Sequence, residues 1–258
     1  MGWSSFVKNL MRKLRNASAN RGYACDICDR ELFNYPRERI CLDCAATLSE
    51  NSGRVCPKCG RKTLADGVCL SCKSRAPKFT IGISPLVYEG ETAGLINRMK
   101  NGNRRLAWYL GERMTDALIG RFSALEKCKT DAEKLLILPV PMTKEKERKR
   151  GYNQAEELSN VVEITLQKAG YFCEIDRDTL IKRADVAEQK HLDFHARAEN
   201  VGKAYHVHKR KILKGRTVVL IDDIMTTGAT GSAIAEKLLS AGAKAVIFLH
   251  AASAPEKK

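Results

Sequence analysis

The chain has 258 residues, an apolar fraction of 44% and a formal net charge of +15. This composition supports a packed core, and the length fits one large domain or a domain with a small additional module. No run of about 18 apolar residues occurs, so the sequence does not predict a transmembrane helix. The positive charge favours polyanionic partners such as nucleic acid, phosphorylated metabolites or anionic lipid surfaces. Many basic proteins have no such partner, so charge alone does not decide.

Residues 1–24 place apolar side chains at helical spacing with basic side chains between them, which predicts a short basic amphipathic helix. Residues 1–15 of this helix contact an anionic membrane surface, a partner, or the protein's own body, and the sequence leaves these alternatives open. Charges interrupt the apolar stretch, so the segment does not resemble a signal peptide. We therefore expect the protein to be cytoplasmic.

Eight of the ten cysteines form four Cys-x-x-Cys pairs within residues 25–72, a spacing typical of zinc knuckles rather than of a disulfide scaffold. The pairs are Cys25 with Cys28, Cys41 with Cys44, Cys56 with Cys59, and Cys69 with Cys72. Two knuckles complete a tetrahedral Cys₄ site, so we expect a double zinc ribbon with two structural Zn²⁺ ions. Sequential pairing is preferred to interleaved pairing, because Pro57, Gly60 and Gly67 make the second unit look self-contained.

Residues 79–252 follow a short basic linker and have the pattern of an α/β domain. The expected strands are residues 81–88, 135–140, 179–181, 204–207, 218–221 and 245–250, and the expected helices are 91–120, 155–166 and 232–241. Gly102 is expected to break the first helix in two. Strands followed by helices predict a parallel sheet flanked by helices. We expect the two remaining cysteines, Cys128 and Cys173, to be buried, and the tail, residues 253–258, to be disordered.

The stretch from Val218 to Thr230, VVLIDDIMTTGAT, joins a buried strand to a helix. Asp222 and Asp223 stand at the carboxyl end of this strand, where ligands of open α/β sheets bind. Two carboxylates suit a ribose diol or a hydrated Mg²⁺ ion, and we predict a catalytic role for this pair. The N–H groups of the following loop suit a phosphate, with predicted contacts at Thr226, Thr227, Gly228, Ala229 and Thr230. A Walker B strand would require a Walker A motif, and the sequence contains none.

Residues 143–150 are a run of charged side chains at the end of another expected strand, and they predict a loop or the solvated start of a helix. Lys149 and Arg150 are candidate contacts for a pyrophosphate, although a plain surface loop explains them equally well. Asn153 follows and is a candidate to line the same site. His250, at the end of the last strand, is a further candidate for substrate contact.

Val218 to Thr230 resembles the signature of type I phosphoribosyltransferases that binds 5-phosphoribosyl 1-pyrophosphate (PRPP). The wider chain resembles the ComF family of bacterial competence proteins, through the paired cysteine knuckles, the segment KRGYNQAE at 149–156, Gln189, Arg197, Asn200 and the acid pair with its TTGAT loop. This resemblance implies a type I phosphoribosyltransferase-like fold behind a zinc ribbon. It also implies PRPP with Mg²⁺ as ligand and a role in DNA uptake during natural transformation, with a competence helicase as partner.

Two functions of different classes remain open from the sequence. In the first, the protein is a phosphoribosyltransferase that transfers a pentosyl group to an unknown acceptor, in nucleotide metabolism without a DNA role. In the second, it is a competence protein that binds single-stranded DNA and uses the same loop for a DNA phosphate. The intact acid pair favours a sugar phosphate, whereas the charge and the zinc ribbons favour DNA. A PRPP-sensing regulator would need the ligand site without turnover.

Overall fold

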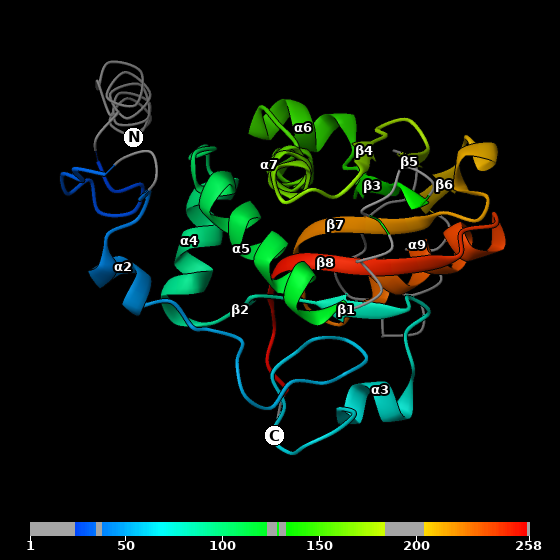
Figure 1. The fold of residues 1–258 in the computed structure, drawn as a ribbon, viewed down its shortest axis with the longest axis horizontal. Coiled ribbons are helices and arrows are strands. Elements are labelled where there is room, and N and C mark those ends of the chain that lie inside the picture. Colours follow the sequence, from blue (N-terminus) through cyan, green and yellow to red (C-terminus); the bar gives the residue numbers. More distant parts are fainter. Residues whose placement is uncertain (1–23, 35–37, 123–127, 129–132, 184–203, 257–258) are drawn as a thin grey trace, which may run out of the picture. The chain divides into compact units, whose positions relative to one another are not determined.

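A computed structural model describes residues 24–34, 38–122, 128, 133–183 and 204–256 (Figure 1). The chain divides into two compact units, residues 1–46 and 47–258. The boundary between the units falls within the predicted cysteine module, residues 25–72, so that two cysteine pairs belong to each unit. The predicted N-terminal helix and residues Gln189, Arg197 and Asn200 lie outside the described residues. In the described ranges, no helix is long and apolar enough to cross a membrane.

The first unit is small and is organised by its cysteines. Its described part contains one short helix, α2 (Leu42–Ala46), and one isolated antiparallel bridge between Ala24 and Glu31. The backbone N–H of Asp26 donates to the carbonyl of Arg39 at 2.8 Å and so joins the two knuckles. Few apolar side chains are buried here, so bound metal is expected to supply much of the folding free energy.

A parallel sheet is the centre of the second unit, as predicted from the sequence. Its strands are β1 (Ile81–Ile83), β2 (Leu86–Val87), β3 (Leu135–Pro139), β4 (Cys173–Ile175), β7 (Thr217–Met225) and β8 (Ala245–Ser253). They run in the order β1-β8-β7-β3-β4, with β2 also paired to β8. Residues 218–221 of β7 are completely buried, which fits their unbroken apolar sequence.

The described helices of this unit are α3 (Leu70–Ser74), α4 (Gly90–Lys100), α5 (Leu106–Arg121), α6 (Lys144–Arg150), α7 (Gln154–Lys168) and α9 (Ala229–Ser240), with a 3₁₀ turn, η3 (Arg210–Leu213), before β7. Helices pack against both faces of the sheet, whereas α3 belongs to the cysteine region. Figure 1 shows α5 and α7 on one face and α9 behind the sheet on the other. A separate hairpin consists of β5 (Leu180–Lys182) and β6 (Tyr205–Val207).

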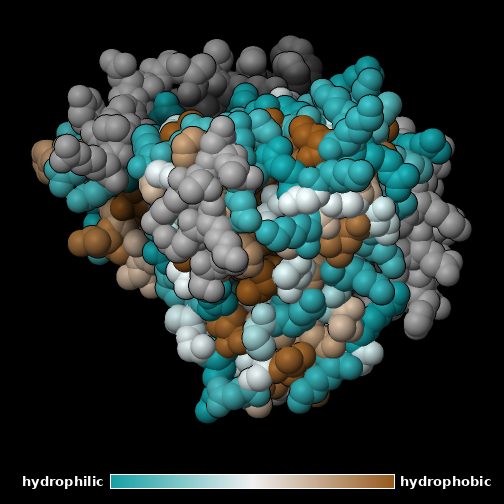
Figure 2. Space-filling view, turned by 45° about the vertical axis from the view of Figure 1, so that its right-hand side comes forward, coloured by the Kyte–Doolittle hydropathy of each residue, from teal (hydrophilic) through white to brown (hydrophobic). Residues whose placement is uncertain are grey.

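Local sequence signals explain where several helices begin and end. Gly102, with a φ of 112°, separates α4 from α5, which confirms the predicted break. The charged run forms the helix α6, because the Thr143 hydroxyl caps its first turn by accepting from the N–H of Lys146. Gly151 ends α6 with a φ of 86°. On the face shown in Figure 2, hydrophobic side chains form small separate patches among hydrophilic ones, as expected for a highly charged chain.

The last two strands are longer than the sequence predicted. Register pairs continue from Asp222 with His250 to Met225 with Ser253, so the acid pair lies inside β7 rather than after it. The expected disorder of the tail is therefore wrong for residues 253–256. Ser253 is buried, and the Glu256 carboxylate accepts from the N–H groups of Leu64 at 3.1 Å and Leu70 at 2.6 Å.

The second pair of knuckles is attached to the edge of the sheet. The side-chain amide of Asn51 donates to the carbonyls of Gly60 at 2.6 Å and Ser84 at 3.0 Å. A Cβ atom at Gly60 would lie 2.3 Å from the carbonyl oxygen of Gly82 in β1, so only glycine allows this close approach. The knuckle between Cys56 and Cys59 is therefore part of the same packed body as the sheet.

The contact between α5 and α7 gives a test of this packing. A Cβ atom at Gly111 in α5 would lie 2.6 Å from the Cβ of Val161 in α7. Gly111→Ala is therefore expected to lower the free energy of unfolding by about 1–3 kcal/mol through overpacking. Gly120→Ala in the same helix, where a Cβ meets nothing within 4 Å, is the control and should cost no stability. Urea unfolding measures both, and equal effects in the two variants would contradict the packing.

Candidate functional site

The phosphate loop, residues 226–230, comprises the turn after β7 and the first two residues of α9. Gly228 has a φ of 78° and stands immediately before the first helical residue, Ala229. Thr226 and Thr227 are exposed, and the Thr227 hydroxyl accepts from the N–H of Ala229 at 3.3 Å. The first N–H groups of a helix have no acceptor within the helix and lie at its positive end. This loop therefore suits an anion such as a phosphate.

The acid pair, Asp222 and Asp223, lies next to the phosphate loop and is partly buried. The N–H of Asp223 donates to the Asp222 carboxylate at 2.9 Å, and the Nζ atom of Lys100 lies 3.1 Å from the Asp223 carboxylate. Burial, and then the negative charge of Asp223, raise the pKa of Asp222 to about 8, while Lys100 opposes this shift. Bringing a cation to the pair would favour both ionised carboxylates.

Lys100 is a site residue that sequence reasoning noticed only as one of several basic residues near a helix break. Its position depends on Tyr152, whose hydroxyl donates to the carbonyl of Met99, the preceding residue in α4. The guanidinium of Arg104 lies 5.0 Å from the centre of the Tyr152 ring. Tyr152 thus anchors the end of α4 beside the acid pair, which is the structural role of this part of the KRGYNQAE segment.

The other predicted site residues of this segment, Lys149, Arg150 and Asn153, differ in their contacts. The Asn153 side chain is 5% exposed and caps α7 by accepting from the N–H of Ala155, while its amide donates to the carbonyl of Val140 at 3.2 Å. Arg150 donates to the Gln154 side chain at 2.9 Å. Lys149 and Arg150 lie in the last turn of α6, and among the described residues neither contacts the phosphate loop. Their expected contact with a pyrophosphate stays a prediction.

His250 does not have the position that its place in the sequence suggested. Its side chain is completely buried, with Nδ1 at 3.2 Å from the carbonyl oxygen of Phe248. Burial lowers the pKa of His250 to about 3, so the imidazole is neutral at physiological pH. A side chain without exposed surface contacts no ligand here, so the predicted substrate contact is corrected to a packing role.

Arg61 is the site residue that sequence reasoning missed. It lies two residues after Cys59, and its Nη2 atom donates to the carbonyl of Thr226 in the phosphate loop at 2.7 Å. Its side chain is 6% exposed, so this hydrogen bond is shielded from water. The two residues are 165 positions apart, and no local pattern connects them. The only available signal was a basic residue adjoining a knuckle.

Two clusters of four thiols are formed by sequential pairs, which confirms the preferred pairing. The first cysteine cluster is Cys25, Cys28, Cys41 and Cys44, and the second cysteine cluster is Cys56, Cys59, Cys69 and Cys72. In each cluster all sulfur atoms lie within 4.8 Å of one another, and one pair in each is 3.7 Å apart. A tetrahedral ion with Zn–S bonds of about 2.3 Å places sulfurs about 3.8 Å apart, so both clusters could hold zinc.

The electrostatics of the second cysteine cluster also fit a bound cation. Burial raises the pKa of Cys56, but N–H donors from Cys69, Cys59 and Lys58 outweigh it and lower that pKa to about 7. Burial is the largest effect on Cys59, and with the neighbouring Cys56 and Cys69 it raises the pKa of Cys59 to about 11. Crowded thiolates repel one another unless a cation lies between them. Four protein ligands leave no open position, so such an ion is structural.

Comparison with known proteins identifies the domain that carries this site. Residues 138–258 match the family model of the phosphoribosyl transferase domain. The chain is 26% identical over 227 residues to competence protein ComFC of Bacillus subtilis (strain 168), covering 87% of this chain and 88% of the relative. It is 26% identical over 211 residues to DNA utilization protein YhgH of Escherichia coli (strain K12), covering 80% and 87%. These similarities confirm the resemblance to the ComF family and a phosphoribosyltransferase domain behind the cysteine clusters.

A solved structure of glutamine PRPP amidotransferase from B. subtilis, complexed with ADP and GMP, also aligns with part of this chain. The sequence identity is 19% and the TM-score is 0.33. The alignment covers 57% of this chain and 26% of that one, so it spans about a quarter of the amidotransferase chain.

The raised pKa of Asp222 predicts a pH dependence of stability. The folded state holds a proton on Asp222 up to about pH 8, whereas a free aspartate has a pKa of about 3.9. The free energy of unfolding therefore falls as the pH rises through this window, because the folded state binds more protons. Asp222→Asn removes the titrating carboxyl group. The free energy of unfolding of this variant, relative to that of the unmodified protein, should therefore increase as the pH rises from about 6 to about 8. Thermal unfolding without added magnesium measures it, and a constant difference across this range would contradict the prediction.

Proposed function

We propose that the protein binds PRPP or a related sugar phosphate with Mg²⁺ at the acid pair and the phosphate loop, and that it acts as a competence protein in DNA uptake. The observation that carries the sugar-phosphate part is the position of two carboxylates beside a glycine-containing loop at a helix start. The names of the relatives, competence protein ComFC and DNA utilization protein YhgH, support the competence part.

The chemistry of each group suggests its role. The N–H groups of Thr226, Thr227, Gly228, Ala229 and Thr230 hold the 5′-phosphate. Asp222 and Asp223 accept from the ribose hydroxyls and hold the hydrated Mg²⁺ ion, which when bound supplies positive charge at the pyrophosphate. Lys100 then leaves Asp223 and becomes available to the same pyrophosphate. Lys149 and Arg150, from the end of α6, provide further positive charge for the leaving group.

Pentosyl transfer is the second candidate function. Loss of pyrophosphate from C1 of the ribose builds a cation-like transition state, and the groups named above have the charges to stabilise this change electrostatically. In this alternative, the protein serves nucleotide metabolism without a DNA role. The described part of the site contains no side chain that evidently selects a base as acceptor. Binding of PRPP is therefore proposed as the main function, and turnover as a separate question.

Single-stranded DNA and a competence helicase are the proposed macromolecular partners. The net charge of +15 supports a polyanionic partner. Binding that depends on this charge should weaken steeply as the salt concentration rises, because each neutralised phosphate releases counterions. The two proposed structural zinc ions would support this role by folding the cysteine units.

Thermal unfolding with Mg²⁺ and PRPP tests the sugar-phosphate site. PRPP should raise the melting temperature of the unmodified protein only when Mg²⁺ is present. At a PRPP concentration of 100 times Kd, binding should increase the free energy of unfolding by about 2.7 kcal/mol. Asp223→Asn should remove this response, because it removes a carboxylate from the pair. Asp116→Asn, an exposed carboxylate on α5, is the matched control and should respond as the unmodified protein does. No response in the unmodified protein, together with salt-sensitive oligonucleotide binding, would reject the proposed site in favour of DNA alone.

A further inference from the structure

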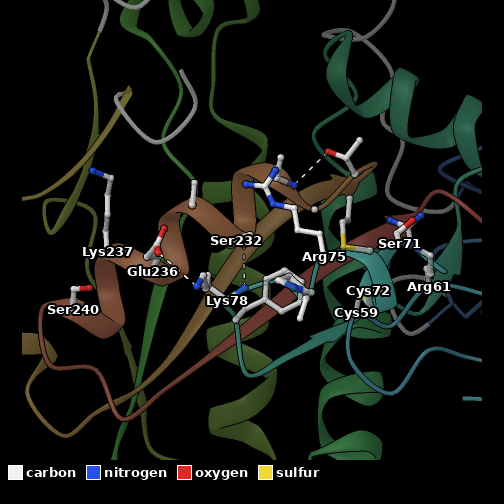
Figure 3. A pocket seen from close by; sticks show the side chains of 18 of the residues that line it. Cys59, Arg61, Ser71, Cys72, Arg75, Lys78, Ser232, Glu236, Lys237 and Ser240 are labelled. Carbon is white, nitrogen blue, oxygen red and sulfur yellow. Dashed lines mark hydrogen bonds and ion pairs between the residues drawn. The ribbon is translucent and has the colours of Figure 1, made fainter. Parts of the chain in front are cut away.

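A cavity of about 610 Å³ lies on the α9 side of the sheet, apart from the acid pair. Its walls come from α9, from β6 and η3, from the linker at residues 75–79, and from the second cysteine cluster (Figure 3). Residues 225 and 227–229 also contribute to the wall, whereas Asp222, Asp223, Thr226 and Thr230 do not. A cavity of this volume is within the range of small-molecule sites, which is about 300–1,000 Å³.

The cavity is strongly basic. Five of its lining residues are Arg or Lys, namely Arg61, Arg75, Lys78, Arg210 and Lys237, and one is acidic, Glu236. Within the described ranges, Arg210 and Lys237 make no ion pair. Lys78 lies 3.8 Å from Glu236, but both side chains are about 60% exposed, so this pair neutralises little of the positive charge. The cavity therefore keeps a net positive charge that is available to an anion.

The innermost cation is only partly satisfied. The guanidinium of Arg61 donates to the carbonyl of Thr226, but its Nε atom is buried and has no partner in the part of the chain that the structure describes. A buried donor without a partner costs about 1–3 kcal/mol, which points to an acceptor that is still to be supplied. This observation is independent of the surface cations.

The walls of the cavity also contain apolar side chains. Ala76, Pro77, Val207, Met225 and Ala233 line the cavity together with the cations. Figure 3 shows the side chains of Arg75, Lys78, Ser232 and Glu236 around this hollow, with the backbone N–H of Lys78 bonded to the Ser232 hydroxyl at 3.0 Å. A ligand for this cavity needs both an anionic group and a body with apolar faces.

We infer that this cavity binds a small organic phosphate with an apolar body, of the size and chemistry of a nucleoside monophosphate. The phosphate contacts Arg210 and Lys237 at the rim, and the flat body lies against the apolar wall with an acceptor atom toward Arg61. This site goes beyond the proposed function, because the acid pair does not line it, although Thr227, Gly228 and Ala229 of the phosphate loop do. It is a second ligand site that borders the phosphate loop.

Equilibrium binding of adenosine 5′-monophosphate to the full chain, by calorimetry without Mg²⁺ or PRPP, tests this site. The double variant Arg210→Gln with Lys237→Gln should weaken binding by about tenfold or more, because two charged partners of the phosphate are lost. Lys168→Gln, an exposed lysine at the end of α7, is the matched control and should bind as the unmodified protein does. Arg210→Gln alone is the substitute if the double variant does not fold.

The phosphate loop also suits a 5′-phosphate, so the experiment separates the two positions. Thr230→Val and Asp223→Asn change the proposed sugar-phosphate site and should leave the binding that depends on Arg210 and Lys237 intact. The inference is overturned if the nucleotide does not bind, if Thr230→Val abolishes binding while the double variant retains it, or if only an oligothymidylate binds at Arg210 and Lys237. If PRPP stabilises the Asp223→Asn variant as much as it stabilises the unmodified protein, that result contradicts the proposed function alone.

Discussion

The hydrogen bond from Arg61 to the carbonyl of Thr226 is the interaction on which the rest of the site depends. It is 2.7 Å long, it is buried, and it joins a cysteine knuckle to the phosphate loop. The knuckle is itself fixed by Asn51, by the close approach of Gly60 to Gly82, and by the carboxylate of Glu256. Short Cys₄ units depend on a metal ion for folding, so metal binding at the second cysteine cluster would also stabilise the shape of the phosphate loop.

The charges of the site are balanced locally, although the chain as a whole is basic. Asp222 and Asp223 repel each other, and the single nearby cation from α4, Lys100, reduces this repulsion. In the free protein, Lys100 partly neutralises the acid pair. A magnesium ion and a sugar phosphate would displace Lys100 and be stronger partners for the carboxylates. On the other side of the loop the charges are not balanced, because basic side chains line a cavity with one acid. The same loop thus separates two regions of opposite electrostatic character.

Much of this architecture could be predicted from the sequence, because it depends on local patterns. The unbroken apolar run before Asp222 predicted a buried parallel strand, and the Cys-x-x-Cys spacings predicted two Cys₄ sites. Pro57, Gly60 and Gly67 favoured the sequential pairing of these cysteines. Features that depend on distant contacts could not be predicted. Arg61 meets Thr226 across 165 positions, and the Glu256 carboxylate accepts from the N–H groups of Leu64 and Leu70, which are more than 180 positions away. The capping role of Asn153 did have a signal, since an asparagine before an amphipathic helix is a common cap.

The PRPP affinity of Arg61→Met tests most directly whether the second cysteine cluster supports the phosphate loop. Arg54→Met, an exposed arginine of the same unit, is the matched control, and zinc content is measured in both variants. We predict that both variants keep two zinc ions per chain, and that only Arg61→Met loses PRPP affinity, by about tenfold or more, since a buried charged hydrogen bond is removed. Unchanged PRPP affinity in a zinc-loaded Arg61→Met variant would contradict this account.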